Sequence, residues 1–220
     1  MADLIQGLSA AQVRDNLDRV RDRIGAAGRD PGDVEILAAV KYLPAGELEP
    51  LAEGGITLVG ENRAQDLVAK AQRHPGLFTW DFIGALQSRR VAALIPHVRY
   101  IHSVATDSAL RQLQRHATPE TRILVEVNIA GEPGKAGIDP RQLPEFLERS
   151  PVVVVGLMTM PPLTDRPEHN RRHFAALREL AERHGLRELS MGTSQDFAPA
   201  VQEGATIIRL GRVLYGRGEA

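Results

Sequence analysis

Short apolar segments alternate with amphipathic segments along almost the whole chain, and this alternation is the strongest constraint on its fold. Eight segments are expected to be strands: Val34–Val40, Thr57–Val59, Phe78–Ile83, Tyr100–Val104, Arg122–Asn128, Val152–Met158, Glu188–Met191 and Thr206–Leu210. Helices fit between them over Ala64–Arg73, Ser88–Ile95, Asp107–His116, Pro140–Arg149, Glu168–His184 and Asp196–Glu203. Strands such as Ile123–Val127 are apolar without strict alternation, as in a parallel sheet covered on both faces. The pattern predicts an α/β fold, a closed (β/α)8 TIM barrel.

An extra helix is expected ahead of the barrel, over residues 9–27. Ser9 and Gln12 have the spacing of a capping box, and Val13 and Leu17 begin an apolar face that continues through Val20 and Ile24. We expect a single domain over residues 1–220, with the barrel at 34–216. The tail Val213–Ala220 is short, so the N-terminal helix is expected to cover the gap after the last strand. An open doubly wound sheet is the alternative, but its G-x-G-x-x-G fingerprint is absent.

Composition excludes several functional classes. Lys plus Arg is 27 and Asp plus Glu is 28, a net charge of −1, which gives no global attraction to nucleic acid or to anionic membranes. The chain has no cysteine, so disulfides and thiolate chemistry are excluded. Neither a signal peptide nor a membrane span is predicted, and we expect a cytoplasmic protein. His169 and His173 are four apart but lack an evident third ligand, so we expect no metal site.

Lysine is rare in this chain, and one lysine directly follows a predicted strand. The three lysines are Lys41, Lys70 and Lys135, whereas Arg supplies nearly all other positive charge. Lys41 follows the apolar run Ile36–Val40, so its amine is expected at the barrel mouth, where desolvation favours a nucleophilic amine. An arginine cannot form an imine, so this position suggests covalent chemistry with an aldehyde. The alternative is a lysine that simply reaches solvent from a strand end.

Two glycine-containing loops are suited to an anion. Gly192-Thr193-Ser194 precedes a predicted helix, and Gly211-Arg212 follows the last strand. Backbone N–H groups at such turns bind phosphate, and the loops after strands 7 and 8 form the usual phosphate site of this barrel. Ordinary turn and capping chemistry is the alternative for each loop alone. Beside a strand-1 lysine, the two loops together indicate a phosphorylated aldehyde.

Eight ordered blocks of sequence then resemble one family. They are Ala38-Ala39-Val40-Lys41; Gly60-Glu61-Asn62-Arg63-Ala64-Gln65; Trp80-Asp81-Phe82-Ile83-Gly84-Ala85-Leu86-Gln87-Ser88; Ile101-His102-Ser103-Val104; Val127-Asn128; Gly156-Leu157-Met158-Thr159-Met160-Pro161-Pro162; Leu189-Ser190-Met191-Gly192-Thr193-Ser194-Gln195-Asp196-Phe197; and Ile208-Arg209-Leu210-Gly211-Arg212. The chain resembles the pyridoxal phosphate homeostasis protein family (YggS/PROSC type), single-domain relatives of the alanine racemase N-terminal domain. The resemblance implies fold-type III binding of pyridoxal 5′-phosphate (PLP).

The resemblance also implies residue roles. Lys41 matches the lysine that forms the Schiff base with PLP, and Asn62 matches a pocket asparagine. Ser194, Gly211 and Arg212 match the phosphate-binding residues, and Arg209 matches the arginine that faces the pyridine nitrogen. Plausible further lining residues are Met191, Gly192 and Thr206. Lys135 is either a secondary PLP acceptor or a mobile loop lysine.

The chain departs from the family pattern outside this set. The family usually has Ser where Val40 stands, His where Asp81 stands and Pro where Ala85 stands. It often has Asn-Lys where this chain has Arg89-Arg90, and the loop Gly131–Lys135 also differs.

The expected function is a PLP carrier or homeostasis protein, with no strong catalytic activity. An arginine of pKa above about 12 cannot protonate the pyridine nitrogen, so carbanion chemistry is discouraged. Racemases of this type use a tyrosine from a second domain, for which this chain has no residues after Ala220, and none of Tyr42, Tyr100 and Tyr215 stands in an obvious catalytic loop. We therefore expect a monomer that holds PLP and passes it to PLP-dependent apo-enzymes.

Two alternatives remain open at the sequence level. The first is a PLP-dependent racemase-like enzyme with Lys41 as one base and a second titratable group, such as His102, on the other side. The second is a Schiff-base aldolase-type barrel without a cofactor.

Overall fold

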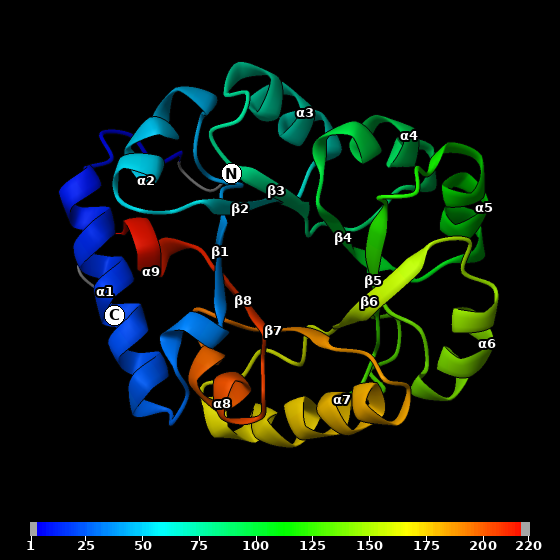
Figure 1. The fold of residues 1–220 in the computed structure, drawn as a ribbon. Coiled ribbons are helices and arrows are strands. Elements are labelled where there is room, and N and C mark those ends of the chain that lie inside the picture. Colours follow the sequence, from blue (N-terminus) through cyan, green and yellow to red (C-terminus); the bar gives the residue numbers. More distant parts are fainter. Residues whose placement is uncertain (1–3, 217–220) are drawn as a thin grey trace.

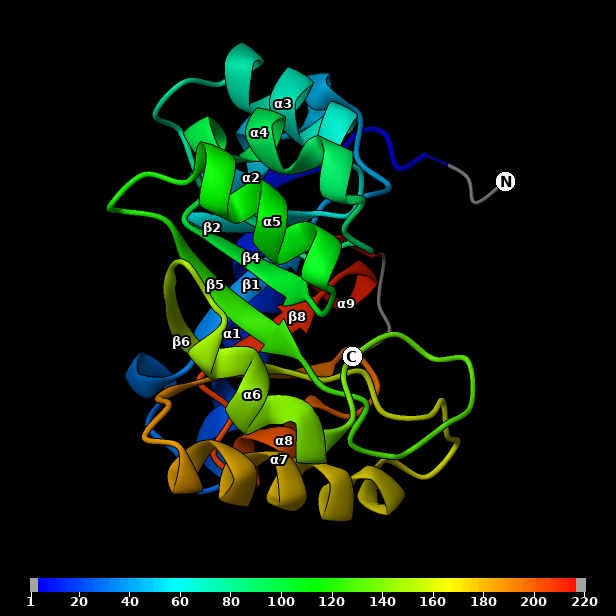
Figure 2. The same cartoon turned by 90° about the vertical axis from the view of Figure 1, so that its right-hand side faces the viewer.

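A computed structural model describes residues 4–216 and shows a closed barrel of eight parallel strands, in sequence order around the ring. The strands are β1 (Glu35–Ala39), β2 (Leu58–Glu61), β3 (Thr79–Phe82), β4 (Tyr100–Val104), β5 (Arg122–Glu126), β6 (Val153–Met158), β7 (Glu188–Thr193) and β8 (Ile207–Leu210). Figure 1 looks into the ring, and Figure 2 shows the strands tilted inside their helical layer. The predicted (β/α)8 barrel is confirmed.

The outer layer consists of helices, of which α1 precedes β1 and each of the others follows a strand. They are α1 (Ala10–Ala26), α2 (Glu49–Glu53), α3 (Ala64–Arg73), α4 (Val91–Leu94), α5 (Asp107–His116), α6 (Leu143–Glu148), α7 (Arg171–Arg183), α8 (Phe197–Gln202) and α9 (Arg212–Tyr215). Short 3-10 turns precede or flank several of them, at Pro31–Asp33, Ala45–Glu47, Ser88–Arg90, Ile95–His97, Pro140–Gln142 and Pro167–Asn170. Within the described residues, every helix is too short or too polar to cross a bilayer.

Helix α1 lies in the outer layer beside α9 and α8, where it was expected to cover the gap after the last strand (Figure 1). It buries the predicted face that begins with Val13 and Leu17. The predicted capping box is wrong, because the Ser9 side chain makes no cap hydrogen bond. Gln12 Nε2 instead donates to the carbonyl oxygen of Gly216 at 2.8 Å, so a tertiary contact replaces the local one.

Most differences from the predicted elements concern short helices. Helix α2, with five residues, and α9, with four, are too short to show a helical period in the sequence. The segment expected as one helix over Ser88–Ile95 is α4 between two 3-10 turns, and Pro96 lies in the second turn. The expected tail becomes α9 over its first residues, and residues 217–220 lie outside the described part of the chain.

Closure of the barrel brings its first and last strands together. Strand β1 pairs with β8 in parallel, from Glu35 opposite Ile207 to Ala38 opposite Leu210. In a parallel barrel all strands end on one side, so the loops after β1 and β8 are neighbours there. Inside the ring, Leu37, Leu58 and Ile207 form a small apolar cluster, whereas the main core lies between the strands and the helices.

Candidate functional site

A cavity of about 820 Å³ opens at the C-terminal ends of the strands. Six of the nine predicted site residues line it: Lys41, Asn62, Ser194, Arg209, Gly211 and Arg212. They come from the ends of β1, β2, β7 and β8, so residues far apart in the sequence meet at one place. The cavity volume is within the usual range for a small-molecule or cofactor site.

The other three predicted residues lie elsewhere. Met191 is fully buried in the core between strands and helices. Gly192 has a φ of +90°, and a Cβ there would lie 2.6 Å from the Cβ of Ala200, so this glycine permits close packing of α8 rather than ligand contact. Thr206 directly precedes β8, whereas Gly211 directly follows it. The Thr206 hydroxyl donates to Glu188 Oε2 at 2.7 Å. The four residues of β8 separate Thr206 from Gly211, so Thr206 lies away from the cavity.

Lys41 lies two residues after the end of β1 and lines the cavity. Its side chain is exposed, and Nζ lies 4.8 Å from the centre of the Tyr42 ring, a cation–π contact. The desolvation expected from its place after an apolar strand is not found, because the cavity is open to solvent at this point. A ligand that filled the cavity would itself remove water from this amine.

The other two lysines have different surroundings. Lys70, on α3, is buried and pairs with the buried Glu61 at 2.5 Å. Lys135, in the loop after β5, forms an ion pair with Glu132 on the same loop. Among the three lysines, Lys41 is the one that lines the cavity.

The Lys70–Glu61 pair fixes the backbone that carries Lys41. Lys70 Nζ donates to the carbonyl oxygen of Val40 at 2.8 Å, one residue before Lys41. The second carboxylate oxygen of Glu61 accepts from the backbone N–H of Asn62 at 2.7 Å. One buried ion pair therefore holds the ends of β1 and β2 together. It thereby also fixes the backbone of the cavity residues Lys41 and Asn62.

The loops after β7 and β8 meet as expected for an anion site. The N–H of Gly211 donates to Ser194 Oγ at 3.3 Å, which joins the two loops directly. Asp196 holds the turn after β7, because its Oδ1 accepts from the N–H of Thr193 at 2.8 Å. Asn170 fixes Asp196 in turn, with Nδ2 2.8 Å from Oδ2. Our sequence reasoning did not assign Asp196, although Thr193-x-x-Asp196 before a helix is a local signal of such a turn.

Arg209 is buried in the cavity wall and almost fully hydrogen-bonded. Nη1 donates to Ser190 O at 2.7 Å and to Ser190 Oγ at 2.6 Å, and Nη2 donates to Thr159 O at 2.9 Å and to Met160 Sδ. Within residues 4–216 the N–H at Nε makes no hydrogen bond, which leaves it for a ligand. Burial lowers the pKa of the guanidinium to about 10, below the value assumed from the sequence, and it stays protonated at neutral pH.

The structure also brings residues to the cavity that the sequence analysis missed. Tyr42 and Tyr215 line it, although the sequence placed neither of them in an obvious catalytic loop. The Tyr215 hydroxyl donates to the carbonyl oxygen of Ala39, and burial raises its pKa. Glu126 on β5 also lines the cavity; a charged residue in a buried strand was the available signal.

His102 does not stand opposite Lys41 in the cavity. It is fully buried inside the barrel, where it contacts Asp81 and Ser190. Metal binding has no support in the described part of the chain, where no cluster of three His, Asp or Glu side chains could hold an ion.

The chemistry of the lining fits PLP. Arg23, Lys41, Arg209 and Arg212 contribute positive charge, against the single carboxyl of Glu126, so an anionic ligand is favoured. The loops of Ser194 and Gly211 offer hydroxyl and backbone donors for a phosphate group. Asn62 Oδ1 is buried without a hydrogen-bond partner in the described structure, an acceptor that a bound ligand can satisfy.

The fold and the site thus define a (β/α)8 barrel with a cationic cavity of about 820 Å³ beside a lysine that follows β1. A scan against protein-family models finds no match. The pyridoxal phosphate homeostasis protein of Aquifex aeolicus is 36% identical over 214 residues, covering 91% of this chain and 94% of that protein. The chain belongs to the pyridoxal phosphate homeostasis protein family.

Solved structures agree with this assignment. PipY of Synechococcus elongatus, in a structure with PLP bound, has a TM-score of 0.78 at 30% identity, covering 93% of this chain and 100% of that one. An alanine racemase of Clostridium difficile has a TM-score of 0.68 at 12% identity, covering 94% of this chain and 57% of the racemase. That second likeness shows the fold alone, and it confirms that the barrel has the predicted racemase-like fold.

Replacement of Lys70 by Met tests the buried ion pair. The change leaves the Glu61 carboxylate buried without its cation, so we expect the free energy of unfolding to fall by about 3 kcal/mol in urea titrations. The double variant Glu61→Gln/Lys70→Met removes both charges and should lose less than Lys70→Met alone. A loss of under about 1 kcal/mol for the single variant would contradict the role of the pair.

Replacement of Glu126 by Gln tests the buried carboxyl. Burial raises the pKa of Glu126 against the opposing pull of Arg209 and Lys135. A carboxyl whose pKa is higher in the folded state costs stability as pH rises above its ordinary value of about 4.3. Glu126→Gln should therefore raise the free energy of unfolding at pH 7 to 8, by something on the order of 1 kcal/mol.

The gain from Glu126→Gln should shrink to nothing as pH falls below about 4, where the carboxyl is protonated in both states. Urea titrations across pH 4 to 8 give this difference. A gain that is constant over the whole range would show that packing, rather than charge, explains it.

Proposed function

We propose that this chain binds PLP in the cavity at the C-terminal ends of the barrel strands and acts in PLP homeostasis. The observation that carries the proposal is the meeting of Lys41, Ser194 and Gly211 around one cationic cavity. Membership of the family and the PLP-bound structure of PipY support it.

The phosphate end of the ligand is assigned to the loops after β7 and β8. Ser194 supplies its hydroxyl and Arg212 its backbone N–H group there. The N–H of Gly211 would turn to the phosphate from its 3.3 Å contact with Ser194 Oγ. A Cβ built on Gly211 would meet one atom within 4 Å, Tyr215 Oη at 3.4 Å, so this position borders the open cavity. Arg209 is assigned to the pyridine nitrogen, through the N–H at Nε that the protein leaves unused.

Lys41 is assigned as the covalent anchor. Its amine would add to the aldehyde carbon, form a C=N double bond and release the aldehyde oxygen as water, a reversible linkage suited to holding and releasing the cofactor. The Lys70–Glu61 pair positions this amine by fixing the carbonyl of Val40. Bound PLP supplies an electron sink for amino-acid chemistry.

A carrier role is favoured over a racemase role by the state of the titratable groups in the cavity. The Tyr215 hydroxyl is held by the carbonyl of Ala39 and its pKa is raised, so it is a poor base at neutral pH. Arg209 is protonated and held by Ser190 and Thr159, which disfavours proton donation to the ring. The presence of Glu126 in the cavity keeps a racemase-like enzyme as the second candidate.

We further propose that the protein acts in the cytoplasm as a monomer and passes PLP to PLP-dependent apo-enzymes. The open mouth of the cavity, where the Lys41 side chain is exposed, supports exchange of the cofactor with a partner or with solvent.

The visible absorption spectrum with added PLP tests the anchor. The wild-type protein should show the band of a Schiff base, whereas Lys41→Ala and Lys41→Arg should lose it, because neither side chain forms an imine. Lys135→Ala is the matched control and should keep the band.

A band that survives in both Lys41 variants would refute the assignment of Lys41. The same preparations distinguish the two candidate functions. Racemisation of L-alanine by the PLP-loaded wild type at an enzyme-like rate would replace the carrier by the racemase-like enzyme.

A further inference from the structure

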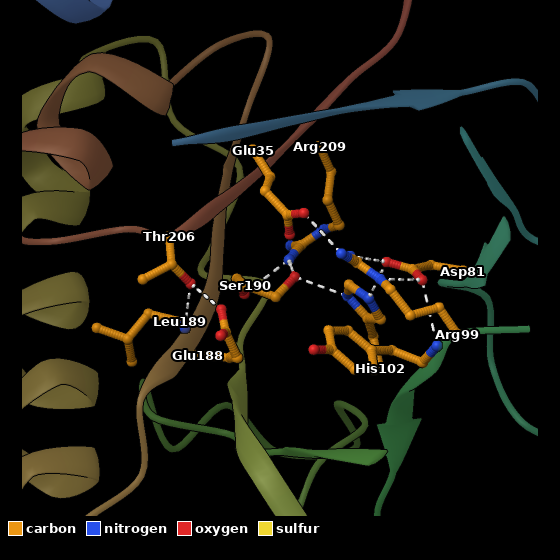
Figure 3. A network of polar contacts seen from close by, with 10 residues as sticks. Glu35, Asp81, Arg99, His102, Glu188, Leu189, Ser190, Thr206 and Arg209 are labelled. Carbon is orange, nitrogen blue, oxygen red and sulfur yellow. Dashed lines mark hydrogen bonds and ion pairs between the residues drawn. The ribbon is translucent and has the colours of Figure 1, made fainter. Parts of the chain in front are cut away.

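A continuous line of buried polar side chains runs through the interior of the barrel and ends at the cavity. It consists of Asp81 on β3, His102 on β4, Ser190 on β7 and Arg209 on β8 (Figure 3). Asp81, His102 and Ser190 have no exposed surface, and Arg209 is 6% exposed. Burial of four polar side chains costs free energy unless each is hydrogen-bonded. A barrel that places all four in its interior therefore requires an explanation of what they do there.

The hydrogen-bond order along this line is fixed by the chemistry of its ends. Arg209 can only donate, and its Nη1 lies 2.6 Å from Ser190 Oγ. The Ser190 hydroxyl is then free to donate to His102 Nδ1, at 2.8 Å. His102 therefore carries its proton on Nε2, which donates to Asp81 Oδ2 at 3.0 Å. Each group donates to the next, from the cavity arginine to a carboxylate.

The charge states agree with this order. Burial lowers the pKa of His102 against the opposing pull of Asp81, so the imidazole is neutral and has one donor and one acceptor. Burial alone would raise the pKa of Asp81, but hydrogen bonds from His102 and Arg99 outweigh it and hold it low.

Asp81, at the carboxylate end of the line, is held by residues that do not line the cavity. Arg99 Nη2 and Nε donate to the two Asp81 oxygens at 2.7 and 3.1 Å, and the N–H of Tyr100 donates to Oδ1 at 3.2 Å. Arg99 also pairs with Glu35 at 2.6 Å. Asp81 is therefore a fixed acceptor at which the line can end.

The same residue types form the Ser–His–Asp triad of hydrolases, but the geometry here serves another purpose. Arg209 donates to Ser190 Oγ, and none of these three side chains is among the residues that line the described cavity. A nucleophile needs access to its substrate, whereas Ser190 reaches the cavity only through Arg209.

We propose that His102 and Asp81 are positioning residues for Arg209: through Ser190 they fix its guanidinium so that the N–H at Nε faces the bound cofactor. This inference rests on the proposed PLP site. Arg209 has other stabilising neighbours, since the charges of Asp196 and Glu126 also favour its protonated form. The line adds direction, because it holds Ser190 Oγ as a fixed acceptor for one of the two Nη1 hydrogens.

Two substitutions of His102 separate hydrogen bonding from packing. His102→Leu removes both ring nitrogens, so Ser190 loses its acceptor and Asp81 loses a donor. His102→Gln keeps one acceptor and one donor on its amide and can restore the order. His74→Leu is the matched control, because His74 is also buried and bonded, to the carbonyl oxygen of Ala45, but lies in the outer layer at the end of α3.

Ser190→Ala provides a smaller change, should His102→Leu not fold. It removes one oxygen from the line and leaves the Arg209 contact with the backbone carbonyl of Ser190 intact. PLP affinity and the position of the visible band are measured for the full chain and each variant.

The expected result is that His102→Leu and Ser190→Ala weaken PLP binding about tenfold and shift the visible band, since ordering of Arg209 contributes about one hydrogen bond to a charged group. His102→Gln should bind within about threefold of wild type with an unshifted band, and His74→Leu should match wild type.

Wild-type affinity and band position in Ser190→Ala and in every folded His102 variant would overturn the inference while leaving the PLP site intact. A His102→Gln variant that behaves like His102→Leu would also overturn it, because packing would then explain the loss. Absence of PLP binding by the wild type would instead refute the proposed function itself.

Discussion

The pairing of β1 with β8 is the constraint on which the rest of the molecule depends. It closes a sheet that would otherwise expose two unpaired edges, and it places the first strand of the barrel against the last. Lys41, near the start of the sequence, thereby meets Gly211 and Arg212 near its end. Helix α1 reinforces the closure from outside, since Asn16 Nδ2 donates to the carbonyl of Leu214 at 3.1 Å and Gln12 to that of Gly216.

Beneath the cavity, this barrel holds charge where many barrels hold only apolar side chains. The apolar interior cluster of Leu37, Leu58 and Ile207 is small, and polar groups of β3, β4, β7 and β8 occupy the same interior. Asp81, His102, Ser190 and Arg209 are tolerated in this interior because each of them has hydrogen-bond partners. The result is a rigid set of donors and acceptors below a cavity that stays open above, an arrangement suited to holding a cofactor in one orientation and still releasing it.

The barrel was predictable from the sequence because its strands are short apolar runs and its longer helices have a clear apolar face. The site was predictable where a residue's position just after a strand places it at the barrel mouth. Lys41 after β1, Ser194 after β7 and Gly211 after β8 are such residues. Thr206 was misplaced because composition does not show which end of β8 a polar residue occupies. Tyr42, Tyr215 and Glu126 were missed because their contact with the cavity depends on short helices and on strand register, which only the packed structure sets.

The central claim is that Lys41 is the residue to which PLP is covalently attached. The most direct test is reduction of the PLP-loaded protein with borohydride, followed by peptide mass spectrometry to locate the pyridoxyl group. The account predicts modification at Lys41 in the peptide that follows β1. Modification of Lys135 or Lys70 with Lys41 unmodified would contradict it.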